Sequence, residues 1–98
     1  MGEFRIATRA RADLIDIYEF SEQRFGAYQA RAYYAGLIRT FSLIADFPEI
    51  GQRADHLKPG YRRIRFQAHL IFYTTQTDHI EVRTVQHSAR DIRPELFE

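Results

Sequence analysis

The sequence predicts a single small α+β domain spanning residues 1–98, in which a helical hairpin packs on a small antiparallel sheet in the order β-α-α-β-β-β. Two stretches, residues 9–25 and 27–44, carry apolar side chains at helical spacing. Three later stretches between residues 61 and 85 are rich in β-branched and aromatic residues and are separated by short polar breaks. A chain of 98 residues is long enough for one hydrophobic core and too short for a second.

The first predicted elements are a short strand at residues 3–7 and a helix that begins at residue 9. Phe4 and Ile6 alternate with more polar neighbours, as in a half-exposed strand. The hydroxyl of Thr8 is expected to cap the helix by accepting an unpaired amide hydrogen of its first turn. Gly26 is expected to end this helix, because glycine adopts the left-handed conformation at low cost.

A second helix is predicted from Ala27 to the Phe47-Pro48 pair, because the residue before a proline is disfavoured in a helix. About one residue separates the two helices, so they are expected to form an antiparallel hairpin whose apolar stripes are covered by the sheet. The apolar positions of the second helix follow helical spacing and are Ala30, Tyr34, Leu37, Phe41 and Ile44.

Residues 61–66, 69–75 and 80–85 are predicted to be consecutive strands of an antiparallel meander. A tight turn at residues 67–68 and a short loop at residues 76–78 would join them. Alternation divides the side chains between two faces of the sheet. The core face is expected to take Ile64, Phe66, Leu70, Phe72, Ile80 and Val82. The opposite face is expected to take Arg63, Arg65, Tyr73, Arg83 and His87.

The outward face is predicted to be basic. No acidic residue lies between Asp55 and Asp78, although the formal net charge of the chain is only +1. Such a local excess of positive charge suits an anionic partner. The alternative is an ordinary solvated face, because arginine commonly occupies the wet side of an antiparallel sheet.

Composition excludes several classes of protein. A hydrophobic content of 45% and an aromatic content of 14% are typical of a folded globular chain and argue against disorder. Without cysteine, neither a disulfide nor a thiolate metal site is possible. No stretch resembles a signal peptide or a membrane span, so a cytoplasmic location is expected. Neither a metal nor another cofactor is expected, because the four histidines lack ligand spacing: His56, His69, His79 and His87.

Five segments, in order along nearly the whole chain, are similar to those of a known family. They are ADLIDIY (residues 12–18), PEIG (48–51), LKPGYR (57–62), HLIFY (69–73) and VQHSARD (85–91). With these segments the chain resembles the ParE branch of the RelE/ParE superfamily, the toxins of type II toxin–antitoxin operons, which include plasmid stabilisation proteins. The resemblance implies the RelE/ParE-like arrangement of a helical hairpin on a small sheet.

The resemblance also implies an activity and a partner. A ParE-like toxin inhibits DNA gyrase, and so replication, without being an enzyme, and is neutralised in a hetero-oligomer by a ParD-like antitoxin with a ribbon-helix-helix domain. The alternative is a RelE-like, ribosome-dependent mRNA endonuclease, which needs groups that exchange protons with the RNA. RelE-like members usually carry a tyrosine near the C-terminus, but position 88 is serine and no tyrosine follows Tyr73. We therefore expect no catalytic residue.

Two sets of binding residues are predicted. The candidates for contact with the target are basic: Arg63, Arg65, Arg83, His87 and Arg90. The candidates for contact with the antitoxin are apolar residues expected on the surface of the helical hairpin: Phe20, Tyr28, Tyr33 and Leu37. The alternative for each member of the second set is that it packs into the core of its own chain.

Overall fold

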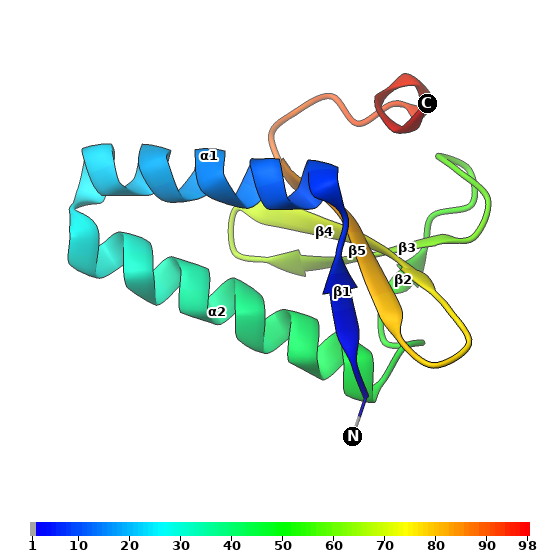
Figure 1. Ribbon diagram of the computed structural model, residues 1–98. Coiled ribbons are helices and arrows are strands. Elements are labelled where there is room, and N and C mark those ends of the chain that lie inside the picture. Colours follow the sequence, from blue (N-terminus) through cyan, green and yellow to red (C-terminus); the bar gives the residue numbers. More distant parts are fainter. Residues whose placement is uncertain (1) are drawn as a thin grey trace.

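Two antiparallel helices pack on one face of a five-stranded sheet in the computed structural model, which describes residues 2–98 (Figure 1). The helices are α1 (Thr8–Phe25) and α2 (Ala27–Asp46). The strands are β1 (Phe4–Ile6), β2 (Gln52–Arg53), β3 (Tyr61–Phe66), β4 (His69–Thr75) and β5 (Ile80–His87). A short 3₁₀ helix, η1 (Pro94–Phe97), ends the chain.

The predicted meander of β3, β4 and β5 and the predicted strand before the helices, β1, are confirmed, and the sheet has one further strand, β2, that was not predicted. The strand order is β1-β5-β4-β3-β2. The predicted first strand, β1, lies parallel to β5 at one edge, and the two-residue β2 pairs with β3 at the other. The sheet is therefore mixed, and its long middle strands are the antiparallel ones.

The helix ends agree with the sequence except at the first cap. Gly26 ends α1 with a φ of 90°, as predicted. The cap of α1 is Ala7 and not Thr8, because the amide hydrogen of Ala7 bonds to the carbonyl of Val82 and the chain turns there, one residue earlier than predicted. Phe47 ends α2 immediately before Pro48.

The main core lies between the helical hairpin and the sheet. Ile71 and Tyr73 of β4 are fully buried there, whereas Tyr73 was predicted to face outward, so that prediction was wrong. The hydroxyl of Tyr73 donates to the carbonyl of Pro48 (2.8 Å) and accepts from the amide of Gly51 (2.9 Å), which satisfies a buried polar group. The fully buried members from the helices and β5 are Ala10, Leu37, Phe41, Ile44 and Val82.

A second, smaller core covers the other face of the sheet. Phe72, predicted to face the helices, packs here against Phe97 of η1, with ring centroids 4.9 Å apart. Leu70 lies beside it on the same face. The amine of Lys58 donates to the carbonyl of Phe97 (2.7 Å) and holds the C-terminal segment down. The segment after β5 thus covers part of the sheet face that lies away from the helices.

A bulge in β5 changes which side chains face the helices. Phe72 pairs with Thr84 but the next residue, Tyr73, pairs with Val82, so Arg83 is an extra residue. Simple alternation would place Val85 and His87 with Arg83 on the outer face. The bulge instead turns Val85 into the main core and brings His87 opposite His69. The prediction that His87 shares a face with the arginines was therefore wrong.

None of the described helices could span a membrane.

Candidate functional site

A groove of about 910 Å³ lies between α1 and the ends of β4 and β5 that adjoin the turn at residues 67–68. We call it the α1 groove. Phe20 and Phe25 line it and are 60% and 61% exposed, which is unusual for large apolar side chains. Its other apolar lining residues are Ile17, Tyr33, Ala68 and Val85. Its charged or ionisable lining residues are Asp13, Asp16, Arg24, His69, His87 and Arg90.

The α1 groove runs beside a part of β5 that has no strand on its outer side. β1 pairs only with Ile80–Val82, so no described strand pairs with Val85–His87 there. The carboxylate of Asp13 supplies hydrogen-bond acceptors to this part of β5. It accepts the amide hydrogen of Val85 (3.0 Å) and the hydroxyl hydrogen of Thr84 (2.5 Å). This contact fixes α1 to β5 and sets the width of the groove.

The contact of Asp13 continues as a chain of hydrogen bonds to the segment after β5. The side-chain amide nitrogen of Gln86 donates to the hydroxyl of Thr84 (2.7 Å). The guanidinium of Arg90 donates to the side-chain amide oxygen of Gln86 (2.8 Å). Thr84 and Gln86 are buried. Arg90, a predicted target contact, is thereby positioned at the α1 groove.

Three ionisable rings meet at the floor of the α1 groove: Tyr33, His69 and His87. The hydroxyl of Tyr33 lies 2.7 Å from Nδ1 of His69 and also accepts the amide hydrogen of Ala68 (3.3 Å). The rings of His69 and His87 meet edge to face with centroids 5.2 Å apart. The amide of Ala89 donates to Nδ1 of His87 (3.0 Å). Simple alternation along β5 does not predict the pairing of the two histidines, which the bulge in β5 creates.

Burial perturbs two members of this cluster. It lowers the pKa of His69, and the nearby His87 lowers it further, because burial and a second positive charge both disfavour the protonated ring. Burial also raises the pKa of Tyr33, although the amide of Ala68 and the charge of Arg65 partly oppose that shift. Both groups therefore favour their neutral forms at neutral pH.

Three of the predicted target contacts lie away from the α1 groove. Arg63 and Arg65 lie on the opposite face of β3, and Arg83 lies beside Thr74 on that same face. We call these three residues the basic face. Arg65 is exposed, with its Nε 2.7 Å from the carbonyl of Gln67. Arg83 is partly exposed and donates to the hydroxyl of Thr74 (3.0 Å). Arg63 is half-buried, and Arg65 is the most exposed of the three residues.

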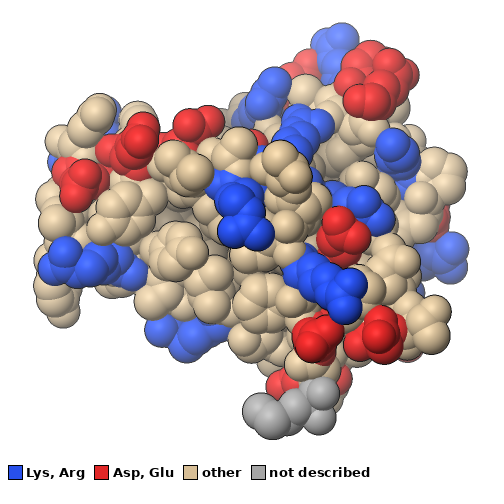
Figure 2. Space-filling model, viewed as in Figure 1, with Lys and Arg blue, Asp and Glu red and all other residues tan. Residues whose placement is uncertain are grey.

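The predicted antitoxin contacts fall into three groups. Phe20 lines the α1 groove, Tyr28 is 77% exposed near the helical turn, and Tyr33 is half-buried in the groove. Leu37 is fully buried in the main core, so its prediction as a surface contact was wrong. The helical spacing that placed Leu37 in the apolar stripe of α2 was the better guide. Figure 2 shows a continuous tan area over the helical hairpin, which consists of residues other than Lys, Arg, Asp and Glu.

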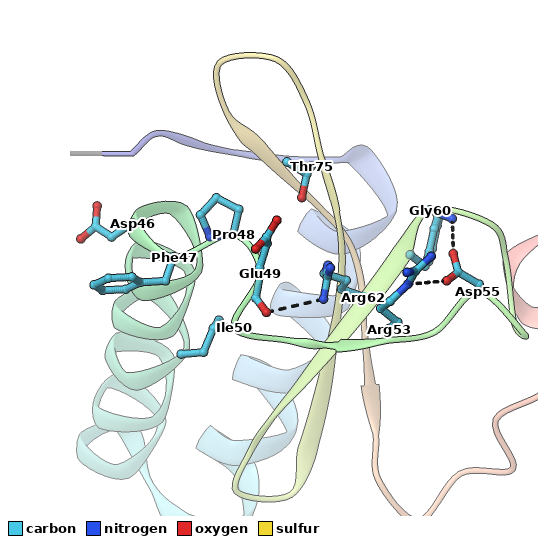
Figure 3. Close-up of a pocket in the computed structure, with 11 residues that line it drawn as sticks. Asp46, Phe47, Pro48, Glu49, Ile50, Arg53, Asp55, Gly60, Arg62 and Thr75 are labelled. Carbon is cyan, nitrogen blue, oxygen red and sulfur yellow. Dashed lines mark hydrogen bonds and ion pairs between the residues drawn. The ribbon is translucent and has the colours of Figure 1, made fainter.

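A second hollow of about 780 Å³ lies where the end of α2 meets β2 and β3 (Figure 3). One of its acids is paired: the carboxylate of Asp55 accepts from Arg53 and from the amide of Gly60, each at 2.9 Å. These two hydrogen bonds lower the pKa of Asp55. Arg62 donates to the carbonyl of Gly51 (2.8 Å). This arrangement stabilises the turn before β3.

Comparison with known proteins identifies the family. Residues 4–92 match the family described as the ParE toxin of the type II toxin-antitoxin system parDE. Toxin ParE1 of Caulobacter vibrioides is 38% identical over 96 residues, which cover 98% of this chain and 99% of that protein. Toxin ParE1 of Mycobacterium tuberculosis is 31% identical over 92 residues, covering 93% and 94%. A solved structure titled "Chromosomal ParDE TA system from P. aeruginosa" shares the fold, with a TM-score of 0.77, 16% identity and coverage of 89% and 96%. This chain belongs to the ParE toxin family of type II toxin–antitoxin systems.

Proposed function

We propose that this toxin inhibits DNA gyrase, and so replication, and that a ParD-like antitoxin encoded beside it holds it inactive. The observation that carries the proposal is the match to the ParE toxin family over residues 4–92. A toxin that stalls another enzyme needs a binding surface and no catalytic group of its own. The activity belongs in the cytoplasm, where gyrase meets DNA.

The basic face suits contact with a gyrase–DNA complex. Arg63, Arg65 and Arg83 carry three positive charges on one side of the sheet, and Glu81, 3.7 Å from Arg83, is the acid that offsets them most closely. An accessible cationic surface speeds association with a strongly anionic partner and orients it.

The α1 groove suits the antitoxin. It offers exposed Phe20 and Phe25, a floor that contains Tyr33, and the side of β5 that no described strand covers. An apolar helix or an extended segment of a partner can bury such a surface. The antitoxin would then also cover His87 and Arg90, which line the same groove. We therefore propose that Phe20 and Tyr33 lie in the antitoxin interface, and we keep the exposed Tyr28 as a candidate that does not line the groove.

The second candidate function is a ribosome-dependent mRNA endonuclease, and the Tyr33–His69–His87 cluster is the observation that favours it. Two histidines and a tyrosine beside Arg90 are groups that can move a proton and hold a phosphate. Against this function, the edge contact of the two rings leaves no room for a phosphate between them. Both Nδ1 atoms are also occupied by hydrogen bonds.

Expression of the toxin without its antitoxin separates the two candidates. Gyrase inhibition predicts filamentous cells and a DNA-damage response with intact transcripts. Cleavage of transcripts at the ribosome, mapped from their 5′ ends, would contradict it.

Toxicity should fall sharply in the triple variant Arg63→Gln, Arg65→Gln, Arg83→Gln. The matched control removes the same charge from exposed positions on the helices: Arg11→Gln, Arg31→Gln, Arg39→Gln.

The antitoxin site is tested by neutralisation in the same cells. Phe20→Ser and Tyr28→Ser should weaken rescue by the antitoxin without reducing toxicity, because both side chains are exposed in the free toxin. Leu43→Ser is the control, since Leu43 is 42% exposed on α2 and does not line the α1 groove. Full rescue of both aromatic variants would place the antitoxin elsewhere.

A further inference from the structure

The two histidines of the α1 groove are held in a form that accepts hydrogen bonds. Nδ1 of His87 receives the amide hydrogen of Ala89 (3.0 Å), and a backbone amide can only donate. His87 is therefore unprotonated at that nitrogen. The hydroxyl of Tyr33 lies 2.7 Å from Nδ1 of His69 and has only a longer alternative acceptor, the carbonyl of Phe66 at 3.4 Å. The shorter contact favours donation to His69, which must then be neutral.

Asp13 and Asp16 line the α1 groove together with the two rings. Among residues 2–98, neither His69 nor His87 forms an ion pair with a carboxylate. Asp13 lines the groove, but its carboxylate is engaged by Thr84 and Val85. The other charged or titratable groups that line the groove with the pair are Asp13, Asp16 and Arg24 of α1, Tyr33 of α2 and Arg90 after β5, and the charge of Arg65 on β3 acts on Tyr33.

Protonation would thus work against several contacts at once. A proton on Nδ1 of His87 removes the acceptor of the Ala89 amide. A proton on Nδ1 of His69 forces the hydroxyl of Tyr33 to turn toward Phe66. Two charged rings whose centroids lie 5.2 Å apart would also repel each other. In the open groove, water around the exposed His87 limits this cost.

A partner that fills the α1 groove removes that water. An apolar segment against Phe20, Tyr33 and the two rings would leave a protonated imidazole in a low-dielectric site, where neither ring is ion-paired with a described carboxylate. The segment therefore binds the neutral pair more tightly than the charged pair. By linkage, protonation of the rings weakens binding of the segment by the same factor by which the bound segment weakens protonation of the rings.

We propose that the antitoxin segment in the α1 groove binds only when His69 and His87 are neutral, so that acidification releases the toxin. This inference rests on the groove being the antitoxin site, as proposed above. The Tyr33–His69–His87 cluster then acts as a pH-sensitive element of neutralisation, and it has no catalytic role.

The size of the effect follows from the ordinary pKa of histidine. If binding requires one neutral ring with a pKa of at most about 6.5, affinity falls at most about tenfold between pH 7.5 and pH 5.5. Because burial lowers the pKa of His69, its own share lies below the tenfold limit.

The test measures the dissociation constant of the purified toxin and its operon's full-length antitoxin at pH 7.5 and pH 5.5. Asparagine places an acceptor oxygen where Nδ1 of histidine lies and does not titrate, so His69→Asn and His87→Asn keep both hydrogen bonds while removing the proton sites. Wild-type affinity should be lower at pH 5.5 than at pH 7.5, by up to about tenfold for the titration of His69. The double variant should bring the ratio of the two constants close to one.

Two controls separate the possible failures. His56→Asn removes an exposed histidine outside the α1 groove and should keep the wild-type ratio. Circular dichroism at both pH values confirms that each variant stays folded. A wild-type ratio near one, or an unchanged ratio in the double variant, would overturn the inference while leaving the antitoxin site intact. Unchanged binding by Phe20→Ser at pH 7.5 would instead overturn the site itself.

Discussion

Asp13 is predicted to be the most sensitive polar residue for stability, because it joins α1 to β5 where no described strand pairs with β5. Asp13→Ala leaves the amide of Val85 and the buried hydroxyl of Thr84 without their acceptor. An unsatisfied buried donor costs about 1–3 kcal/mol, so the free energy of unfolding should fall by about 2–5 kcal/mol. A small domain has only about 5–15 kcal/mol to lose.

Urea denaturation followed by circular dichroism measures the loss. With a slope of about 2 kcal/mol per molar urea, the midpoint should fall by about 1–2.5 M. Asp13→Asn keeps an acceptor oxygen and should lose less than half as much. The matched control is Asp16→Ala, because Asp16 is an exposed acid of the same helix and should change stability by under about 0.5 kcal/mol. A value for Asp13→Ala as small as that of the control would refute the assigned role.

Three further predictions concern packing and pH. Gly36→Ala should destabilise by about 1–3 kcal/mol in urea melts, because a Cβ there would lie 2.3 Å from the ring of Phe66; no change would mean that the ring moves freely. Phe97→Ala should cost about 3–5 kcal/mol, since this ring fills the second core against Phe72; a cost below 1 kcal/mol would mean that η1 is not firmly packed. The lowered pKa of His69 means that the native state binds fewer protons than the unfolded state. Stability should therefore fall as the pH drops below about 6.5, and His69→Asn should reduce that fall; equal slopes would contradict the shift.

The helices and the central meander were predictable because their signals are local. Gly26 and Pro48 mark helix ends through their own backbone restrictions, and the strands alternate between short polar turns. The unbroken apolar run of Leu70–Tyr73 indicates that both faces of this strand are buried, since a half-exposed strand usually alternates. That signal explains why Phe72 lies in the second core and Tyr73 in the first.

The candidate site was less predictable because it depends on pairing between distant segments. The bulge at Arg83 has no marker such as glycine, yet it moves Val85 and His87 to the other face of the sheet. The contact of His69 with His87 follows from this shift. The part of β5 without a neighbouring strand exists because β1 ends after Ile6, and no local pattern in β5 reports that length. Sequence alone could therefore name Phe20, Tyr33 and Arg90 but could not place them in one groove.

Supercoiling of relaxed plasmid by purified gyrase is the measurement that tests the proposed activity most directly. Addition of the toxin should stop supercoiling and leave cleaved DNA bound to the enzyme, and prior mixing with the antitoxin should prevent both effects. Arg63→Gln, Arg65→Gln, Arg83→Gln should be much weaker than the control with three arginines removed from the helices. Undiminished supercoiling by gyrase, in the presence of toxin that arrests growth when expressed, would contradict the account.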